Sequence, residues 1–343
     1  MRNSNILSSL AFLCSAGYAA AAWPEPEPCT GNCTYIHDPA LARRPDGTWL
    51  RFSTLGNIAI ATAPSLTGPW EYEGAMLPEG TKIDTGIVGQ ELWAPDVFYV
   101  AEENKFYAYY SVSKSGSQSS DIGVATSESG MPGTWEDHGS VGVPKSGRYN
   151  LIDANFFREC DTCTNHWFFG SAWDGVFHTT LNDDHLTWSG VEPTQMLYNS
   201  TFPPNQDYPA IVEGGFLFWW PIDGKNVYFM FFSSGACCNN KDDLENPGDE
   251  YKILVCKGDS PTGPWKDKDG KDCRTENGGT LLLGSHGENV YAPGGQGVGV
   301  DPDTNRIFIY YHYANPKIGY EYAKFLFGFN YLDVSSGWPE ITV

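Results

Sequence analysis

The sequence predicts an all-β protein, a five-bladed β-propeller that spans residues 23–343. Five successive segments of the chain each contain four short runs of apolar and β-branched residues, separated by turn residues. Aromatic residues make up 15 % of the chain and are dense in these runs, as in packed sheets. Acids begin four of the segments at intervals of 58, 57 and 60 residues: Asp38, Asp96, Asp153 and Glu213.

The first unit shows the pattern in full. It begins with YIHDPALARRPDGTWLRFST at residues 35–54, where two apolar runs flank Pro-Asp-Gly, a sequence typical of a hairpin turn. NIAIATAPSLTGPWEYEG at residues 57–74 adds a third strand, a turn and a fourth strand. An Asp-Pro pair at the mouth of one hairpin is ordinary turn chemistry. Its recurrence as an acid at the start of later units calls for another explanation.

Four further units repeat these strands and turns, and no segment indicates a long helix. A β-sandwich is the alternative all-β fold, but it would not produce this period. The fifth unit is delayed by an insertion that carries four cysteines. The later units begin with APDVFYVAEENKFYAYYS at 94–111, DANFFRECDTCTNHWFFGSAW at 153–173, VEGGFLFWWPIDGKNVYFMFFSSG at 212–235 and APGGQGVGVDPDTNRIFIYYHYA at 292–314.

The N-terminal residues predict export. Residues 1–22, MRNSNILSSLAFLCSAGYAAAA, combine one basic residue, an apolar stretch and a run of alanines, which is the pattern of a secretory signal peptide. No later stretch has 18 unbroken apolar residues, so we expect a secreted, soluble and monomeric mature protein. Asn199 and Asn32 begin acceptor sequences for N-glycosylation.

The net charge of the chain limits the classes of molecule that it is expected to bind. The formal net charge is −21 and no basic cluster is present. Nucleic acid and anionic membranes are therefore excluded as good partners, and a neutral substrate is favoured over a polyanion.

The cysteines predict a disulfide-bonded protein. Eight remain after the signal peptide, and an even number in an exported chain indicates bridges. Short spacings predict two local ones, Cys29–Cys33 and Cys160–Cys163. We expect each member of the adjacent pair in the insertion to bond one of the two later cysteines, in an order that stays open: Cys237, Cys238, Cys256 and Cys273.

The repeated acids predict a functional site. The innermost strand of each propeller blade runs along the central axis, so residues at the starts of these strands converge on one face. Clustered acids raise one another's pKa and would destabilise the fold unless they serve a function. Chemistry that needs one protonated and one ionised carboxyl can use such a cluster.

Several segments resemble glycoside hydrolase family 43, from about Cys29 to the C-terminus. They are HDPAL, LWAPDVFY, NLIDANFF, VEGGFLF and the repeated IGVATS…GTW. The chain is most similar to fungal endo-1,5-α-L-arabinanases through ELWAPDV, the SSG and CC pair, EYKI and YAPGGQGV. The resemblance implies a five-bladed propeller that hydrolyses internal bonds of arabinan and arabino-oligosaccharides with inversion and requires no cofactor.

The resemblance also implies the catalytic residues. Asp38 matches the general base that activates water, and Glu213 matches the general acid that protonates the leaving oxygen. Asp153 matches the third carboxylate, which raises the pKa of the acid and holds its orientation. Asp96 is expected to be structural and to bond a neighbouring loop.

Five further residues are candidates for contact with the sugar. Trp93 would offer a flat aromatic face, and His37 would bond a hydroxyl or support the general base. Three polar residues at the same face complete the expected set: Asn155, Ser171 and Ser233.

One departure from the family concerns metal. Bacterial arabinanases often carry a histidine in a PGHN segment near a metal on the propeller axis, whereas this chain has Gly295 and Gln296 there. His286 lies upstream but at a spacing that does not match. We therefore expect no metal ligands, and an axial calcium stays open as an alternative.

Other functions remain open at this stage. An exo-acting α-L-arabinofuranosidase or a β-xylosidase would share the family, and only the loops decide between a groove and a pocket. A fructan hydrolase would need an Arg-Asp-Pro that this chain lacks, although Glu159 and Cys160 form its Glu-Cys pair. A catalytically inactive sugar-binding propeller would not need three convergent carboxylates.

Overall fold

The computed structural model describes residues 23–199, 211–237 and 244–343. In these residues the chain forms five separate four-stranded antiparallel sheets, so the predicted five-bladed β-propeller is confirmed. The described residues contain no α-helix, and one 3₁₀ turn, η1, covers Tyr322–Lys324. The predicted signal peptide, residues 1–22, lies outside the described residues. No helix in the described ranges is long and apolar enough to cross a membrane.

The first three blades follow the predicted units, and each adds its strands in chain order. Their strands are β1 (Ala40–Arg43), β2 (Trp49–Ser53), β3 (Ala59–Ala63), β4 (Glu71–Ala75), β5 (Glu91–Val100), β6 (Lys105–Ser113), β7 (Asp121–Ser127), β8 (Glu136–Ser140), β9 (Asn155–Phe157), β10 (His166–Phe169), β11 (Val176–Thr180) and β12 (Thr194–Leu197).

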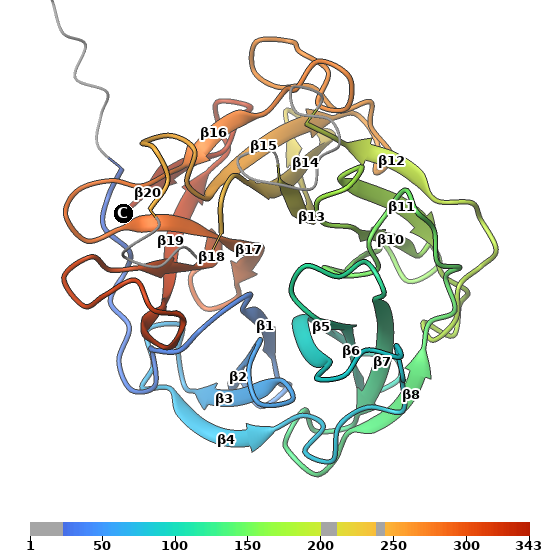
Figure 1. Ribbon diagram of the computed structural model, residues 1–343. Coiled ribbons are helices and arrows are strands. Elements are labelled where there is room, and N and C mark those ends of the chain that lie inside the picture. The colour runs from blue at the N-terminus through green and yellow to red at the C-terminus, as the bar shows by residue number, and fades with distance from the viewer. Residues whose placement is uncertain (1–22, 200–210, 238–243) are drawn as a thin grey trace, which may run out of the picture.

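The last two blades have the longest inner strands. Their strands are β13 (Val212–Ile222), β14 (Lys225–Ser234), β15 (Lys252–Gly258), β16 (Thr280–Leu283), β17 (Tyr291–Asp301), β18 (Arg306–Ala314), β19 (Leu326–Asp333) and β20 (Glu340–Thr342). Figure 1 shows the blades arranged around a central axis, with β1, β5, β13 and β17 innermost and β4, β8, β12, β16 and β20 at the rim.

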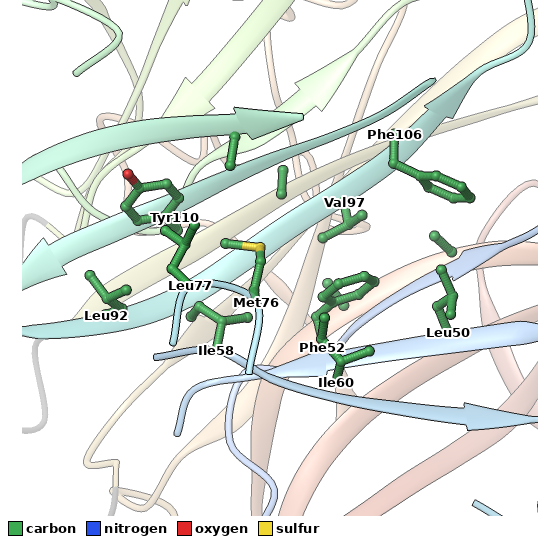
Figure 2. Close-up of a cluster of buried hydrophobic side chains, with 14 of the residues drawn as sticks. Leu50, Phe52, Ile58, Ile60, Met76, Leu77, Leu92, Val97, Phe106 and Tyr110 are labelled. Carbon is green, nitrogen blue, oxygen red and sulfur yellow. The ribbon is translucent and has the colours of Figure 1, made fainter. Parts of the chain in front are cut away.

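The core lies between neighbouring blades rather than at the axis. Leu50 and Phe52 of β2 are fully buried against Phe106 and Tyr110 of β6 in one cluster that joins the first two blades (Figure 2). Side chains alternate between the two faces of a strand, so Trp49 packs on the opposite face, in a cluster shared with the fifth blade. Both faces of the inner strands are covered, which explains their nearly continuous apolar runs.

The N-terminal segment closes the ring between the last and first blades. It runs beside β19, where the amide of Glu27 donates to the carbonyl of Phe329 at 2.8 Å and the amide of Phe327 donates to the carbonyl of Cys33 at 3.0 Å. Arg51 of β2 lies at the same junction, and its guanidinium packs over the rings of Trp70 and Phe327. Hydrogen bonds and packing thus join the two ends of the propeller.

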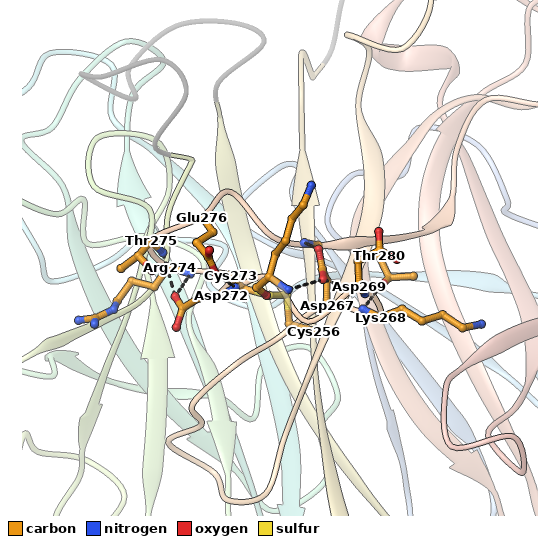
Figure 3. Close-up of a disulfide and its surroundings, with 12 residues drawn as sticks. Cys256, Asp267, Lys268, Asp269, Asp272, Cys273, Arg274, Thr275, Glu276 and Thr280 are labelled. Carbon is orange, nitrogen blue, oxygen red and sulfur yellow. Dashed lines mark hydrogen bonds between the residues drawn. A yellow bond between two sulfur atoms is a disulfide. The ribbon is translucent and has the colours of Figure 1, made fainter.

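The two predicted local bridges, Cys29–Cys33 and Cys160–Cys163, are confirmed. The prediction for the insertion is wrong, because Cys256 and Cys273 bond each other (Figure 3). The chain leaves β15 and returns beside it through a bridge between Lys257 and Lys266, which leaves the two Cα atoms 6.7 Å apart. Cys237 is also disulfide-bonded, while Cys238 lies outside the described residues.

Candidate active site

A residue in the left-handed backbone conformation precedes or interrupts the inner strand of every blade, and β17 has a second one, Ala292, with a φ of 51°. The five residues are Asp38, Ala94, Asp153, Gly214 and Gly295, with φ angles of 42°, 41°, 58°, 59° and 59°. A positive φ is uncommon for residues other than glycine, so its recurrence marks the same position in all five blades. The left-handed residue turns the chain at the end of the propeller axis where the predicted site lies.

This position corrects the alignment of the acids. The blade-two counterpart of Asp38 is Ala94, and Asp96 lies two residues later, beyond a bulge in β5. Glu213 lies one residue before its blade's left-handed glycine, beside a similar bulge in β13. The bulges shift the register, so equal sequence intervals did not give equal positions. Only Asp38 and Asp153 are equivalent.

The register shift gives Asp96 a structural place. Its carboxylate accepts the backbone N–H of Phe156 at 2.6 Å and thereby ties blade two to blade three. It lines a smaller cavity on the axis beneath the cleft. The bond to Phe156 is in line with the expected structural role of Asp96, which stays a prediction.

Three carboxyl groups from three blades meet in one cleft of about 570 Å³. Asp38 precedes β1, Asp153 precedes β9, and Glu213 lies in β13. The sequence-predicted residues that line this cleft are His37, Asp38, Trp93, Asp153, Ser171 and Glu213. Residues separated by up to 176 positions are brought together because five of them lie at the start of an inner strand, while Ser171 follows β10, the second strand of its blade.

Two hydroxyl groups hold the carboxyl of Glu213. Ser171 donates to Oε2 at 2.5 Å, and Tyr251 donates to Oε1 at 2.7 Å. Each oxygen of the carboxyl therefore has one donor, which fixes its plane in the cleft.

Asp38 is held by residues of the first and of the last blade, which meet where the ring closes. Thr54 of the same blade donates to its Oδ2 at 2.8 Å, and its backbone N–H donates to Nδ1 of His312 at 3.0 Å. A Cβ on Gly295 would lie 2.6 Å from Oδ1 of Asp38 and 2.7 Å from Nδ1 of His312. Only glycine leaves room for both groups at this point.

Burial changes the protonation of these two acids. It raises the pKa of Asp38 to about 6, and the hydrogen bond from Thr54 opposes the rise. Burial also raises the pKa of Glu213, with Ser171 and Tyr251 opposing and the charge of Asp38 adding to the rise. Desolvation is the leading cause in both cases because it disfavours the charged form.

The pKa of Asp153 is raised as well. Burial, then the charge of Glu213, then that of Asp38 raise its pKa well above the ordinary value, while the N–H of Gly214 opposes the rise. We expected a negative Asp153 to raise the pKa of Glu213. The repulsion between the two carboxyls acts on both of them, so a charged Glu213 raises the pKa of Asp153 and a charged Asp153 raises that of Glu213; the role of Asp153 as modulator stays a prediction.

The predicted sugar-contact residues divide into two groups. His37 and Trp93 line the cleft with Ser171. The ring of His37 is stacked on Tyr322 with centroids 3.6 Å apart and contacts His312 at 4.6 Å, so it supports the wall next to Asp38. The indole of Trp93 is half-buried, and its N–H donates to Glu91 at 3.0 Å.

Asn155 and Ser233 do not line this cleft, in contrast to the expectation, although Asn155 lines the smaller axial cavity together with Asp38 and Asp153. Asn155 is buried in β9 and accepts the backbone N–H of Leu217 at 2.9 Å. Ser233 is fully buried, donates to Gln296 at 2.6 Å and accepts the N–H of Gly295 at 3.0 Å. Both side chains join blades, a use that their sequence positions alone do not reveal.

Sequence reasoning also missed residues that shape the site. Tyr251, Thr54 and His312 hold the acids, and Trp173 and Tyr322 line the cleft. Tyr251 lies in the segment EYKI and His312 in YYHYA. A search for polar residues at the ends of the second and third strands that lie nearest the cleft would have found Tyr251, Thr54 and His312.

The two residues that stand in place of the PGHN segment are used within the protein. Gly295 has no side chain to offer, and Gln296 accepts from Ser233 and donates to the carbonyl of Gly214 at 2.7 Å. Both the oxygen and the nitrogen of the Gln296 side-chain amide are therefore already hydrogen-bonded. Across the part of the chain that the structure describes, no group of three or more His, Cys, Asp or Glu side chains could hold a metal ion.

Comparison with known proteins agrees with this geometry. Residues 34–327 match the model of the glycosyl hydrolases family 43. The chain is 42 % identical to the probable arabinan endo-1,5-alpha-L-arabinosidase A of Aspergillus flavus, over 97 % of this chain and 99 % of the relative. It is also 42 % identical to arabinan endo-1,5-alpha-L-arabinosidase A of Aspergillus aculeatus, over 98 % and 99 % of the two chains.

A solved structure shares the architecture. The Cellvibrio cellulosa alpha-L-arabinanase complexed with arabinohexaose aligns with a TM-score of 0.75 and 26 % identity, over 90 % of this chain and 95 % of that one. The sequence match, the propeller and the three carboxyls in one cleft lead to the same conclusion: the chain belongs to the glycosyl hydrolases family 43.

Proposed function

We propose that this protein hydrolyses internal α-1,5-L-arabinofuranosidic bonds of arabinan with inversion of configuration. The meeting of Asp38, Asp153 and Glu213 in one cleft carries the proposal. It is supported by the full-length similarity to fungal proteins named as arabinan endo-1,5-alpha-L-arabinosidases.

Asp38 acts as general base and Glu213 as general acid. Asp38 takes a proton from a water molecule as the water oxygen attacks the anomeric carbon. The bond from that carbon to the glycosidic oxygen breaks, and Glu213 gives its proton to the departing oxygen. Inverting glycosidases hold the two carboxyls roughly 6.5–9.5 Å apart to leave room for the water. Exchange with solvent then returns both groups to their starting protonation states.

The surroundings of the two acids suit these roles. The raised pKa of Glu213 keeps a proton available for the leaving group. Thr54 bonds the carboxylate of Asp38, which favours its ionised form. Asp153 accepts the N–H of Gly214, the residue after Glu213, and so orients the backbone that carries the acid.

The cleft offers aromatic surface for a sugar chain. Trp93 and Trp173 line it together with Tyr322. Aromatic rings suit a neutral ligand because they bury apolar sugar faces without requiring charge. Contact with aromatic rings does not require a charged substrate, which suits a chain rich in acidic residues.

The remaining features fit a secreted monomer. Residues 1–22 act as its signal peptide, and the disulfides suit an oxidising compartment. Arabinan and arabino-oligosaccharides are its substrates, and hydrolysis by two carboxyls requires no cofactor.

Incubation with linear debranched arabinan, with the products resolved by length, tests the proposal. Endo action releases mixed oligosaccharides at early times. Arabinose alone would indicate exo action, and activity only on xylo-oligosaccharides would contradict the assignment to arabinan. Binding without hydrolysis would identify a sugar-binding propeller.

A further inference from the structure

We propose a second sugar-binding surface on the flank of the first blade, a hollow between Tyr35 and Tyr72 that holds the arabinan chain outside the cleft. This inference rests on the proposed function and extends it to a separate part of the molecule. The hollow measures about 210 Å³ and is lined by both tyrosines together with residues of the N-terminal segment and of β2 and β3.

Exposed aromatic side chains point to this surface. Among the described residues, three aromatic side chains are strongly exposed: Tyr35 at 39 %, Tyr322 at 41 % and Tyr72 at 60 %. Tyr322 lines the cleft, and its ring contacts that of Tyr35 edge-on with centroids 6.0 Å apart. Tyr35 in turn shares the hollow with Tyr72. The three rings therefore form a path from the carboxyls to the rim.

The backbone holds the path in place. Tyr35 has a φ of 62°, a conformation that costs energy for an aromatic residue and persists only when its surroundings impose it. Tyr72 lies on β4, the outermost strand, three strand spacings from the innermost strand, or roughly 14 Å at about 4.8 Å each. A polymer that leaves the cleft at Tyr322 could continue past Tyr35 to Tyr72 at the rim.

The chemistry of the hollow suits a neutral polysaccharide. Its lining contains no acid, although the protein carries a net charge of −21. Asn32, Thr34 and Ser53 supply amide and hydroxyl groups around the two rings. The one charged member, Arg51, is 2 % exposed, lies over Trp70 and donates to Asn32, so it forms the floor. Apolar rings with a few polar groups are typical of sites that bind uncharged ligands.

Tyr72→Ala tests the surface, with Leu281→Ala as the matched control. Both residues are the second residue of the outermost strand of a blade, and both are exposed, Tyr72 at 60 % and Leu281 at 48 %. Migration is measured in native gels that contain linear arabinan. The gels use the Glu213→Gln background so that the polymer stays intact, and any glycan on Asn32 is first removed with an endoglycosidase.

We expect Tyr72→Ala to weaken the apparent affinity for arabinan roughly two- to tenfold, the loss of one aromatic contact. Tyr72→Trp should retain it, and Leu281→Ala should match the parent. In the active background, Tyr72→Ala should lower the ratio of kcat/KM on the polymer to kcat/KM on arabinotriose by a similar factor.

Unchanged retardation of Tyr72→Ala, or equal losses in Tyr72→Ala and Leu281→Ala, overturns the second surface. If the wild type cleaves arabinan and Tyr72→Ala behaves like it, only the surface is refuted. If the Glu213→Gln protein is retarded by arabinan but the wild type cleaves none, the proposed function is refuted while the gels still decide the surface. A parent that arabinan does not retard refutes the surface directly.

Discussion

His312 of the last blade accepts the backbone N–H of Asp38 through Nδ1 at 3.0 Å, so the closure of the ring also positions the proposed general base. Other blade junctions use hydroxyls for the same bond. Thr54 accepts the N–H of Ala94 at 2.7 Å, and Ser111 accepts the N–H of Asp153 at 3.0 Å. The same bond recurs where Ser233 accepts the N–H of Gly295, so side chains of one blade fix the start of the next and thereby set where Asp38 and Asp153 stand.

His312→Ala should lower kcat by about tenfold or more, because a small displacement of a reacting group is costly. The buried N–H of Asp38 would lose its partner, which should reduce the free energy of unfolding by about 1–3 kcal/mol. Steady-state kinetics and thermal unfolding check both effects. His312→Gln offers a side-chain oxygen as acceptor and should recover part of each loss; full activity of His312→Ala would remove His312 from the site.

Asp38→Asn and Glu213→Gln should each abolish most turnover with the fold intact. A substrate with an aryl leaving group separates their roles, because such a group departs without a proton. Glu213→Gln should recover far more activity on it than Asp38→Asn. Nuclear magnetic resonance should show the first-formed product with the anomeric configuration opposite to that of the substrate. Retention of configuration, or an active Asp38→Asn enzyme, contradicts the assignment.

Tyr251→Phe should move the alkaline limb of the pH–rate profile to higher pH. Tyr251 donates to Oε1 of Glu213 and thereby lowers the pKa of that carboxyl. Without the donor the pKa rises, so the acid keeps its proton to higher pH. Tyr228→Phe removes a similar bond, to Glu159, and should leave the profile unchanged. An alkaline limb that stays fixed in Tyr251→Phe would show that Glu213 does not set it.

The protein should lose stability as the pH rises from about 4 to about 7. Burial raises the pKa of Asp96 to about 7, above the value of about 3.9 in an unfolded chain. A raised pKa gives full stability below the unfolded value and loses it as the pH passes the folded one. Asp96→Asn should therefore flatten the fall of Tm with pH. Asp183→Asn, at an exposed position, serves as the control and should leave the slope unchanged.

Chelation by EDTA should leave both activity and Tm unchanged. Gln296 uses its amide on Ser233 and Gly214, and Gly295 offers no side-chain ligand. Calcium added back after dialysis should likewise have no effect. A loss of activity that calcium restores would establish a metal requirement and revive the axial site.

The blade units and the two shortest disulfides follow from the sequence because each depends on nearby residues. Alternating apolar runs and the Pro-Asp-Gly turn after β1 are local signals, as are cysteines three or four positions apart. The family segments likewise identified Asp38, Asp153 and Glu213 as candidates. These features required no knowledge of how the blades meet.

The tertiary structure alone decided which residues share the cleft. Bulges in β5 and β13 shift the register, which a fixed interval cannot reveal, and so Asp96 faces the axis rather than the cleft. Asn155 and Ser233 looked like sugar contacts but are buried as links between blades. Tyr251 and His312 reach the acids from strands 38 and 274 residues away. Contacts of that range depend on how five sheets close into a ring, because each blade buries its faces only against its neighbours.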